Sequence, residues 1–548
     1  MNAATGGRGM TSTPPINQSQ THNIMNLRIM LSLLSCCLPF AGSAAQAAAG
    51  KPNIIVFLSD DMGYGDPQCL NPDSKIPTPN IDRLAMQGMT FTDAHTASSI
   101  CTPSRYGLLT GRYCWRSRVP TGIVWYWDLP LIEKDRLTIP RMLKQHGYAT
   151  ACIGKWHLGM DWPLKDGSYI SDHEKNVLLP WSKREEYGRR IDFSRPIRSG
   201  PMSYGFDHYF GTDVPNFPPY CFIENDHTLG IPTLPKPKDM FGRSWGPMIE
   251  GWILEKILPT LTEKAVATID QHAASQSGQP LFLYFASTAP HDPILPDKPF
   301  QGKSKAGPYG DLVHQVDWTL GRILQALERN GMAENTIIVF TSDNGSPGYA
   351  GDPFQHGKDA FEPGAVVKMH SHNPSHIYRG YKWHIWDGGH RVPFIVRWPG
   401  RIKAGSKCSQ TVCLTDLMRT FAGMLGHPLP EDAAEDSYDI MPLLKGSDRP
   451  VREATVHHSG MAGPDMGIGN GFAIRQGPWK IIWGVGPNGK AKDRVKNLPP
   501  DHPIGELYDM QRDPSEQHNL WNERQDVVRR LVSLLEKYQH EGRSVPTE

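Results

Sequence analysis

The chain has 548 residues and a net charge of +1, from 57 basic and 56 acidic residues with no long run of either sign. This balance excludes a partner, such as nucleic acid, that is held by bulk electrostatic attraction, so anion recognition must depend on a few placed residues. A hydrophobic fraction of 39% excludes a largely disordered chain, and the length allows a large core and more than one domain.

The first 47 residues have the pattern of an export signal behind a polar extension. Arg28 precedes an apolar run over residues 29–40, and Ala45-Gln46-Ala47 fits a small-x-small cleavage site. The run is shorter than the roughly 20 residues of a membrane span. We therefore expect a signal peptide over residues 1–47 and a protein that is periplasmic or secreted. Retention of the segment as an anchor, or a lipid on Cys36, is the alternative.

After this segment, short apolar runs alternate with helical patterns. Runs that are apolar on both faces are typical of parallel strands covered by helices. They occupy residues 53–58, 149–153, 281–285, 336–340 and 394–396. Residues 311–329 carry apolar side chains at three- and four-residue steps, which predicts a helix that ends before Gly331. Strands that alternate with helices predict a layered α/β fold.

Two regions depart from this alternation. Residues 162–248 are rich in proline, aromatic and charged residues with little periodicity, so we expect an insertion of long loops that shapes a binding site. Residues 471–475 and 479–483 predict hairpin strands around a Gly-Pro turn, and a helix is expected over 522–540. We therefore expect a main domain over residues 48–445 and a smaller α+β domain over 446–548.

The chain has nine cysteines, two of which lie in the expected signal. The remaining seven are an odd number, which in an exported protein suggests a leftover thiol or a modified cysteine. No CxxC pair is present, so the spacing fits no zinc site. Disulfide pairing stays open, with Cys408 and Cys413 the closest pair in sequence.

Polar side chains follow four of the predicted strands at their carboxyl ends, where open α/β sheets bind ligands. They are oxygen donors, a lysine and imidazoles, namely Asp60, Asp61, Lys155, His157, His291, Asp343 and Asn344. The all-oxygen donors among them suit calcium or magnesium rather than zinc or copper. Either acidic pair alone could be a turn or a helix cap, but two pairs at strand ends favour a metal site.

The most distinctive motif is Cys101-Thr102-Pro103-Ser104-Arg105, followed by Leu109-Thr110-Gly111. Pro103 suits the first turn of a helix, and the free amides at that end attract an anion. A cysteine at such a helix end, beside Arg105, is expected to be acidified. On composition alone, a structural half-cystine ahead of a helix is the alternative.

This motif resembles the C-x-P-S-R…L-T-G signature of the sulfatase family, within the alkaline-phosphatase-like superfamily. A maturation enzyme reads that signature when it oxidises the cysteine to formylglycine. Other segments resemble further landmarks of the family in the same order: Asp60-Asp61, residues 154–159, Pro290-His291, residues 342–345, 380–382, 388–393, 507–509 and 513–516, and Asn519-Leu520. One departure is visible, because Asp387 stands where many members carry glutamate.

The resemblance implies a large mixed, mostly parallel sheet flanked by helices, with a smaller C-terminal α+β domain. It also implies hydrolysis of sulfate esters by a formylglycine made from Cys101, assisted by one calcium ion. The implied calcium ligands are Asp60, Asp61, the modified Cys101, Asp343 and Asn344. The implied sulfate pocket is lined by Arg105, Lys155, His157, His291 and Lys382. A formylglycine-generating enzyme is the implied partner, and a sulfated glycan or small molecule the implied substrate.

Two other functions stay open at this stage. One is hydrolysis of phosphate or phosphonate esters, because some members of the superfamily with that activity share the cysteine motif. The other is non-catalytic ligand binding with Cys101 as a thiol. The sulfate position, O-sulfate against N-sulfate, and exo against endo action are also open.

Two further clusters are expected to have lesser roles. The histidines around Lys382 are expected to lie in loops near an anionic substrate or in solvent, rather than to bind zinc. They are His370, His372, His376 and His384. Trp125-Tyr126-Trp127 offers rings that could stack on a sugar, and we expect at least one of them to pack in the core.

Overall fold

The computed structural model describes residues 50–242, 245–459, 471–483 and 505–546. The expected signal peptide and the alternative lipid site at Cys36 lie outside these residues. Within the described ranges, no helix combines the length and the apolarity that a membrane span requires.

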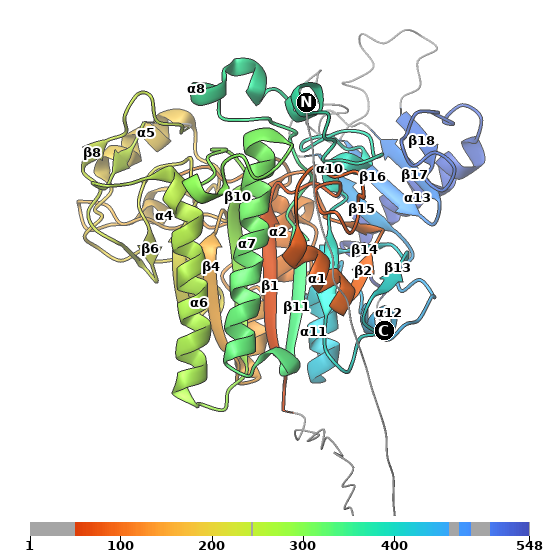
Figure 1. The fold of residues 1–548 in the computed structure, drawn as a ribbon, viewed down its shortest axis with the longest axis horizontal. Helices are drawn as coiled ribbons and strands as arrows, with labels where there is room; N and C mark the ends of the chain where they lie inside the picture. The colour runs from red at the N-terminus through yellow and green to blue at the C-terminus, as the bar shows by residue number, and fades with distance from the viewer. Residues whose placement is uncertain (1–49, 243–244, 460–470, 484–504, 547–548) are drawn as a thin grey trace, which may run out of the picture. The chain divides into compact units, whose positions relative to one another are not determined.

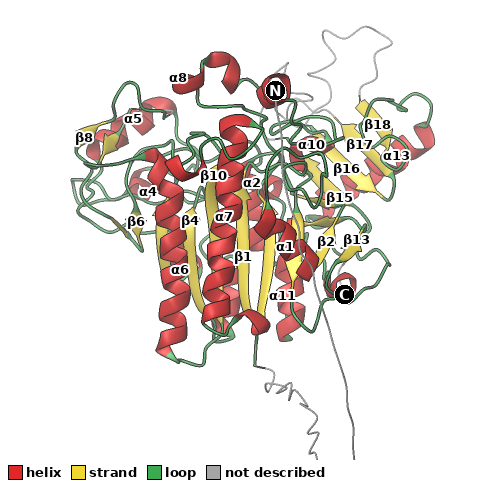
Figure 2. Cartoon of the chain, viewed as in Figure 1, coloured by secondary structure: helices red, strands yellow, loops and turns green. Residues whose placement is uncertain are grey.

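A ten-stranded mixed sheet forms the centre of the described residues (Figures 1 and 2). Its strand order is β13-β2-β12-β11-β1-β10-β4-β5-β6-β7. The bounds are β1 (Asn53–Asp60), β2 (Met89–Phe91), β4 (Ala149–Lys155), β5 (His208–Thr212), β6 (Ile223–Glu224), β7 (His227–Thr228), β10 (Leu281–Pro290), β11 (Thr336–Ser342), β12 (Phe394–Arg397) and β13 (Ser406–Cys408). The central strands β11, β1, β10, β4 and β5 are parallel, and β12 is antiparallel to β11. The predicted mixed, mostly parallel sheet is confirmed.

Helices cover both faces of this sheet, because successive strand residues point to opposite sides. Ile55 and Phe57 of β1 belong to one apolar cluster with α1 (Pro79–Gln87), α6 (Ile257–Ser275) and α7 (Gly307–Arg329), which lie in front in Figure 1. Ile54, Val56 and Leu58 belong to the opposite cluster. Helices α2 (Cys101–Thr110), α3 (Ile139–Gln145) and α11 (Leu417–Leu425) contribute to it. The predicted helix over 311–329 is the greater part of α7.

The segment 162–248 contains more regular structure than the predicted long loops. It holds α4 (Ile170–His173), α5 (Trp181–Arg190), a small hairpin of β8 (Leu234–Pro235) with β9 (Pro247–Met248), and the strands β5, β6 and β7. β5 pairs in parallel with β4, so this segment extends the main sheet. The sequence of β5, His-Tyr-Phe-Gly-Thr, has no apolar run of the kind that marks the central strands.

The last part of the chain forms a separate four-stranded antiparallel sheet, at the upper right in Figure 2. Its strands are β15 (Thr455–His458), β16 (Phe472–Gln476), β17 (Trp479–Trp483) and β18 (Gly505–Asp509). Gln476 pairs with Trp479, which confirms the predicted hairpin. Helix α13 (Gln525–Glu541) covers this sheet through an apolar cluster that includes Ile474 and Leu531.

Short elements complete the described chain. They are β3 (Ala94–His95), paired with β14 (Val412–Cys413), and the helices α8 (Pro353–His356), α9 (Ala365–His370), α10 (Asp387–His390) and α12 (Met441–Leu444). All seven cysteines among the described residues are free thiols, so Cys408 and Cys413 are not joined.

Candidate active site

The carboxyl ends of β1, β10, β4 and β11 meet at one edge of the sheet, the upper edge in Figure 1, and the start of α2 lies against them. Asp60 ends β1, Lys155 ends β4, and Asp343 follows β11. Asp61 and His157 follow their strands with positive φ values of 69° and 57°. Such backbone strain in residues other than glycine is concentrated at functional sites.

The two acidic pairs predicted from strand ends lie in direct contact. The backbone N–H of Asp61 donates to Asp343 Oδ1 at 3.1 Å, and Asn344 Nδ2 donates to Asp61 Oδ1 at 2.6 Å. Arg105 Nη2 lies 2.8 Å from Asp343 Oδ2 and 3.3 Å from Asp60 Oδ1, so the guanidinium bridges the two carboxylates. All five side chains are fully buried.

Two lysines complete the neutralisation of these carboxylates. Lys155 Nζ lies 2.9 Å from Asp60 Oδ2, and Lys382 Nζ lies 2.7 Å from Asp61 Oδ1. Burial alone would raise the pKa of Asp60, but Lys155 and the other cations hold it well below its ordinary value. Burial and the neighbouring Asp60 raise the pKa of Asp343 to about 7, although Arg105 opposes them.

Cys101 is the first residue of α2, and Pro103 lies in the first turn as predicted. The thiol is buried, and burial raises its pKa in spite of the nearby Lys155 and Lys382. The expectation of an acidified cysteine is therefore wrong, because the loss of hydration outweighs the cations. A raised pKa favours the protonated thiol, which is a weaker nucleophile than a thiolate.

A cavity of about 250 Å³ opens onto Cys101. Three more of the predicted side chains line it, namely His157, His291 and Lys382. Arg105 and Lys155 are not among the lining residues; they lie behind the cavity, paired with the carboxylates. Cys101, His157, His291 and Lys382 thus line the cavity, whereas Arg105 and Lys155 neutralise the carboxylates behind it.

The hydrogen bonds of the two lining histidines define their tautomers. His157 Nε2 lies 2.9 Å from the carbonyl oxygen of Val124, so it carries the proton, and the buried Nδ1 has no partner. Burial and the cations Lys155 and Arg105 lower the pKa of His157 well below its usual range. Its Nδ1 is therefore a free lone pair, as a general base requires.

His291 has the opposite tautomer, with its proton on Nδ1. Its Nδ1 lies 2.7 Å from the carbonyl oxygen of Asp292 and donates to it, which leaves Nε2 facing the site, 3.8 Å from Asp61 Oδ2. Burial lowers the pKa of His291, and Asp292 opposes that effect. An anionic ligand in the cavity would raise this pKa again and favour a proton on Nε2.

The donor set at this edge fits a hard cation. One ligand atom from each of Asp60, Asp61 and His291 lies within 4.8 Å of the others. Asn344 Oδ1 is buried and has no hydrogen-bond partner, although such atoms are nearly always paired. Carboxylate and amide oxygens are the ligands that calcium and magnesium prefer.

Aromatic side chains that the sequence pattern did not single out line the same cavity. Phe217 stacks on Trp125 at 5.2 Å on one wall, and Tyr349 lies 6.0 Å from Trp383 on another. Of the predicted aromatic triplet, Trp125 lines the cavity, whereas Trp127 is buried against Trp162. No sequence spacing links residues 217, 349 and 383 to the cysteine motif.

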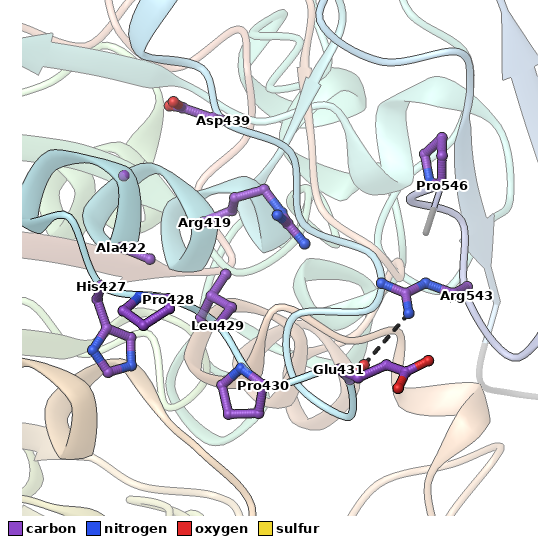
Figure 3. Close-up of a pocket in the computed structure, with 11 residues that line it drawn as sticks. Arg419, Ala422, His427, Pro428, Leu429, Pro430, Glu431, Asp439, Arg543 and Pro546 are labelled. Atoms are coloured by element: carbon purple, nitrogen blue, oxygen red, sulfur yellow. Dashed lines mark hydrogen bonds between the residues drawn. The ribbon is translucent and has the colours of Figure 1, made fainter. Parts of the chain in front are cut away.

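The remaining sequence candidates lie elsewhere. None of the four histidines around Lys382 is among the residues that line the cavity, and His372 is buried with its Nε2 2.8 Å from Asp66 Oδ1, contrary to the prediction of a solvated loop histidine. A larger hollow of about 750 Å³ lies beside α11 and is lined by Arg419, His427, Glu431 and Arg543, among others (Figure 3). It contains none of the predicted site residues.

Comparisons with known proteins identify the family of the chain. Residues 52–427 match the family model described as sulfatase, and residues 381–541 match the model described as N-sulphoglucosamine sulphohydrolase, C-terminal. An N-acetylgalactosamine-6-O-sulfatase of Bacteroides thetaiotaomicron is 34% identical, over 89% of this chain and 93% of its own length.

Solved structures of sulfatases and related hydrolases have a similar fold. One from work on glycosaminoglycan metabolism by Bacteroides thetaiotaomicron has a TM-score of 0.70 and 32% identity, covering 89% of this chain and 99% of its own. A phosphonate monoester hydrolase of Agrobacterium radiobacter, at 18% identity, has a TM-score of 0.53 over 89% of this chain and 95% of its own, and shares the fold alone. Because the sulfatase family model matches more than half of the chain, the chain belongs to the sulfatase family of sulfuric ester hydrolases.

Proposed function

We propose that this sulfatase hydrolyses sulfate esters of carbohydrates through a formylglycine made from Cys101, with one calcium ion beside it. The observation that carries the proposal is the placement of Cys101, His157, His291 and Lys382 around one cavity, directly in front of Asp60, Asp61, Asp343 and Asn344. A maturation enzyme that oxidises Cys101 and an export signal over residues 1–47 are parts of the same proposal.

Asp60, Asp61, Asp343, Asn344 and the modified residue 101 are proposed to hold the calcium ion. When bound, the ion would neutralise charge on the sulfate oxygens and on the nucleophile. The orphaned Asn344 Oδ1 supports the assignment, because a cation supplies the partner that this buried oxygen lacks.

The side chains around the cavity are suited to the two halves of the reaction. The hydrated aldehyde at residue 101 carries two hydroxyls; one attacks sulfur as Asp343 takes its proton, and the bond from sulfur to the leaving alcohol breaks. His291, helped by Lys382, gives a proton to that alcohol oxygen. His157 Nδ1 then takes the proton of the second hydroxyl, so the aldehyde re-forms and sulfate leaves.

A sugar ring is the substrate class that the cavity favours. Its volume, about 250 Å³, is below the roughly 300–1,000 Å³ of pockets for drug-sized ligands, so it suits a sulfate with one ring rather than a chain. The aromatic walls at Trp125, Phe217, Tyr349 and Trp383 offer flat apolar faces to such a ring. The relative named N-acetylgalactosamine-6-O-sulfatase is consistent with this class.

Turnover of an aryl sulfate and of the matching aryl phosphate by the same preparation tests the proposal against its alternatives. We expect a clear preference for the sulfate, because Lys382 and the two histidines face a cavity with no further cation among its lining residues to hold an extra negative charge. A preference for the phosphate would make the protein a phosphoryl or phosphonyl hydrolase. Absence of any turnover would favour non-catalytic binding.

Removal of calcium is expected to abolish activity and to lower the melting temperature. Calcium at 100 times its dissociation constant stabilises a folded protein by about 2.7 kcal/mol relative to the metal-free protein. Differential scanning fluorimetry of dialysed protein, with and without calcium, measures this shift. Asp343→Asn should lose the shift, whereas Asp66→Asn, which changes a buried carboxylate paired with His372, should keep it. Full activity in calcium-free protein would contradict the assignment.

A further inference from the structure

The segment 379–387 connects the active site to the C-terminal sheet. Lys382 lies near its start, with Nζ 2.7 and 2.8 Å from the two carboxylate oxygens of Asp61 and its backbone N–H donating to Ser346. Asp387 begins α10 a short distance on. The position of the Lys382 ammonium in the cavity therefore depends on how both ends of this segment are held.

One residue of the C-terminal part contacts both ends. The backbone carbonyl oxygen of Glu516 accepts a hydrogen bond from Arg379 Nη1 at 2.9 Å. Its carboxylate Oε2 accepts from the backbone N–H of Asp387 at 2.7 Å. Glu516 is fully buried, and its φ of 54° is a left-handed value that is unusual for a glutamate. These contacts join residues more than 120 positions apart along the chain.

A buried charge network fixes the carboxylate of Glu516 in this place. Lys480 Nζ lies 2.7 Å from Glu516 Oε1 and 2.8 Å from Asp387 Oδ1, and Arg391 Nη2 lies 2.8 Å from Asp387 Oδ2. Lys480, Glu516 and Asp387 are all fully buried. Removal of one partner from such a network leaves a buried charge unpaired, so the arrangement tolerates little movement.

Three buried histidines beside this network, His95, His390 and His457, are close enough together to suggest a metal site. The rings of His390 and His457 are stacked, with centroids 4.0 Å apart and planes at 9°, so their in-plane lone pairs do not converge on one ion. Lys480 Nζ also lies 3.2 Å from His390 Nε2, and His457 Nδ1 is 2.7 Å from the carbonyl oxygen of Thr96. These histidines therefore belong to the buried hydrogen-bond network around Lys480 and do not form a metal centre.

We propose that Glu516 is a positioning residue for catalysis, which holds both ends of the segment 379–387 and thereby places the Lys382 ammonium in the cavity. No residue of the 513–516 motif lines that cavity. The motif thus acts on the reaction through the segment, from the loop that follows β18. This role rests on the proposed function, because it requires that Lys382 contributes to turnover.

A double-mutant cycle with Lys382 tests the proposal. Glu516→Ala is expected to lower kcat for an aryl sulfate by about tenfold to a hundredfold, the scale of an ångström-sized misplacement of a catalytic group. In Lys382→Ala protein, the same change at Glu516 should have almost no additional effect, because the group that it positions is gone. Independent, multiplicative losses in the double variant would overturn the proposal.

Asp416→Asn is the matched control, since Asp416 is a buried carboxylate with one arginine partner, Arg452, at 3.1 Å, and its other carboxylate hydrogen bonds are with the backbone N–H groups of Cys413 and Tyr438, outside segment 379–391. At a temperature where both variants are folded, Asp416→Asn should keep near-normal kcat. A loss of kcat in Asp416→Asn equal to that in Glu516→Ala would mean that both act by general destabilisation. Glu516→Gln, which keeps the shape and an acceptor for the Asp387 N–H, replaces Glu516→Ala if the latter does not fold, and should be the milder of the two.

Hydrogen exchange gives a reading that does not depend on activity. Amides of the peptide 379–391 should exchange faster in the Glu516 variant than in wild-type or Asp416→Asn protein. Unchanged exchange in that peptide would overturn the positioning role. If wild-type protein fails to hydrolyse any sulfate ester, the proposed function fails. Faster exchange in the Glu516 variant would in that case still establish that Glu516 holds the segment 379–387 in place.

Discussion

Replacement of Cys101 by serine is expected to leave a folded protein that completes at most one turnover. Serine can take the place of the thiol at the start of α2 with little change in volume, so the helix and its contacts should persist. A serine that attacks sulfur becomes a sulfate ester with no second hydroxyl on the same carbon, and it has no route to expel the sulfate. The loss of steady-state kcat should be on the order of 10⁵- to 10⁶-fold, the scale seen when other enzymes lose their nucleophile.

The measurement is a rapid-mixing assay of a nitrophenyl sulfate, with the melting temperature as a check on folding. The expected result is either no product or a burst of no more than one equivalent, followed by no further release. Cys101→Ala provides the control, because it should show no burst. Sustained turnover by the serine variant would show that release of sulfate does not require the second hydroxyl of a formylglycine hydrate.

Replacement of His291 by alanine is expected to damage hydrolysis of a sugar sulfate far more than hydrolysis of nitrophenyl sulfate. A sugar hydroxyl is a poor leaving group and needs its proton in the transition state, whereas an activated phenol barely does. Loss of a general acid typically costs about 10²- to 10⁴-fold, and this factor should appear mainly with the sugar sulfate. Steady-state kcat/KM for the two substrates measures the difference.

His157→Ala is the matched control for this experiment, because His157 lines the same cavity and has its free Nδ1 assigned to the second half of the reaction. Its loss should slow turnover of both substrates to a similar limiting kcat, since both form the same sulfated residue 101, and should leave kcat/KM, which reports the first half of the reaction, little changed. If His291→Ala also slows both substrates equally, its role is positioning or support of the metal site. The proton donor would then be Lys382 or His157.

Much of the fold and the site could be predicted because the signals are local. The runs 53–58 and 336–340 are buried on both faces, and in a parallel sheet their carboxyl ends must meet at one edge. That rule placed Asp60-Asp61 beside Asp343-Asn344, and the structure has Asp61 in hydrogen-bond contact with both Asp343 and Asn344. The C-terminal hairpin was visible for the same reason, since its Gly-Pro turn separates two short strands.

What could not be predicted depends on burial or on contacts between distant residues. The pKa of Cys101 is governed by its loss of hydration, which a motif does not reveal. β5 joins the main sheet as a strand of mixed polarity within a loop-rich segment, so its pattern does not stand out. The hydrogen bonds that Glu516 accepts from Arg379 and Asp387 cross more than 120 residues and follow from no local spacing.

The most direct test of the proposed mechanism is the chemical identity of residue 101 in active protein. The protein is purified from a host with a formylglycine-generating enzyme and is first shown to turn over an aryl sulfate. It is then digested, and the peptide that contains residue 101 is analysed by mass spectrometry. The account predicts that the thiol sulfur is replaced by a carbonyl oxygen, and that specific activity rises in proportion to the modified fraction. An unmodified thiol in protein that turns over at full rate would contradict it.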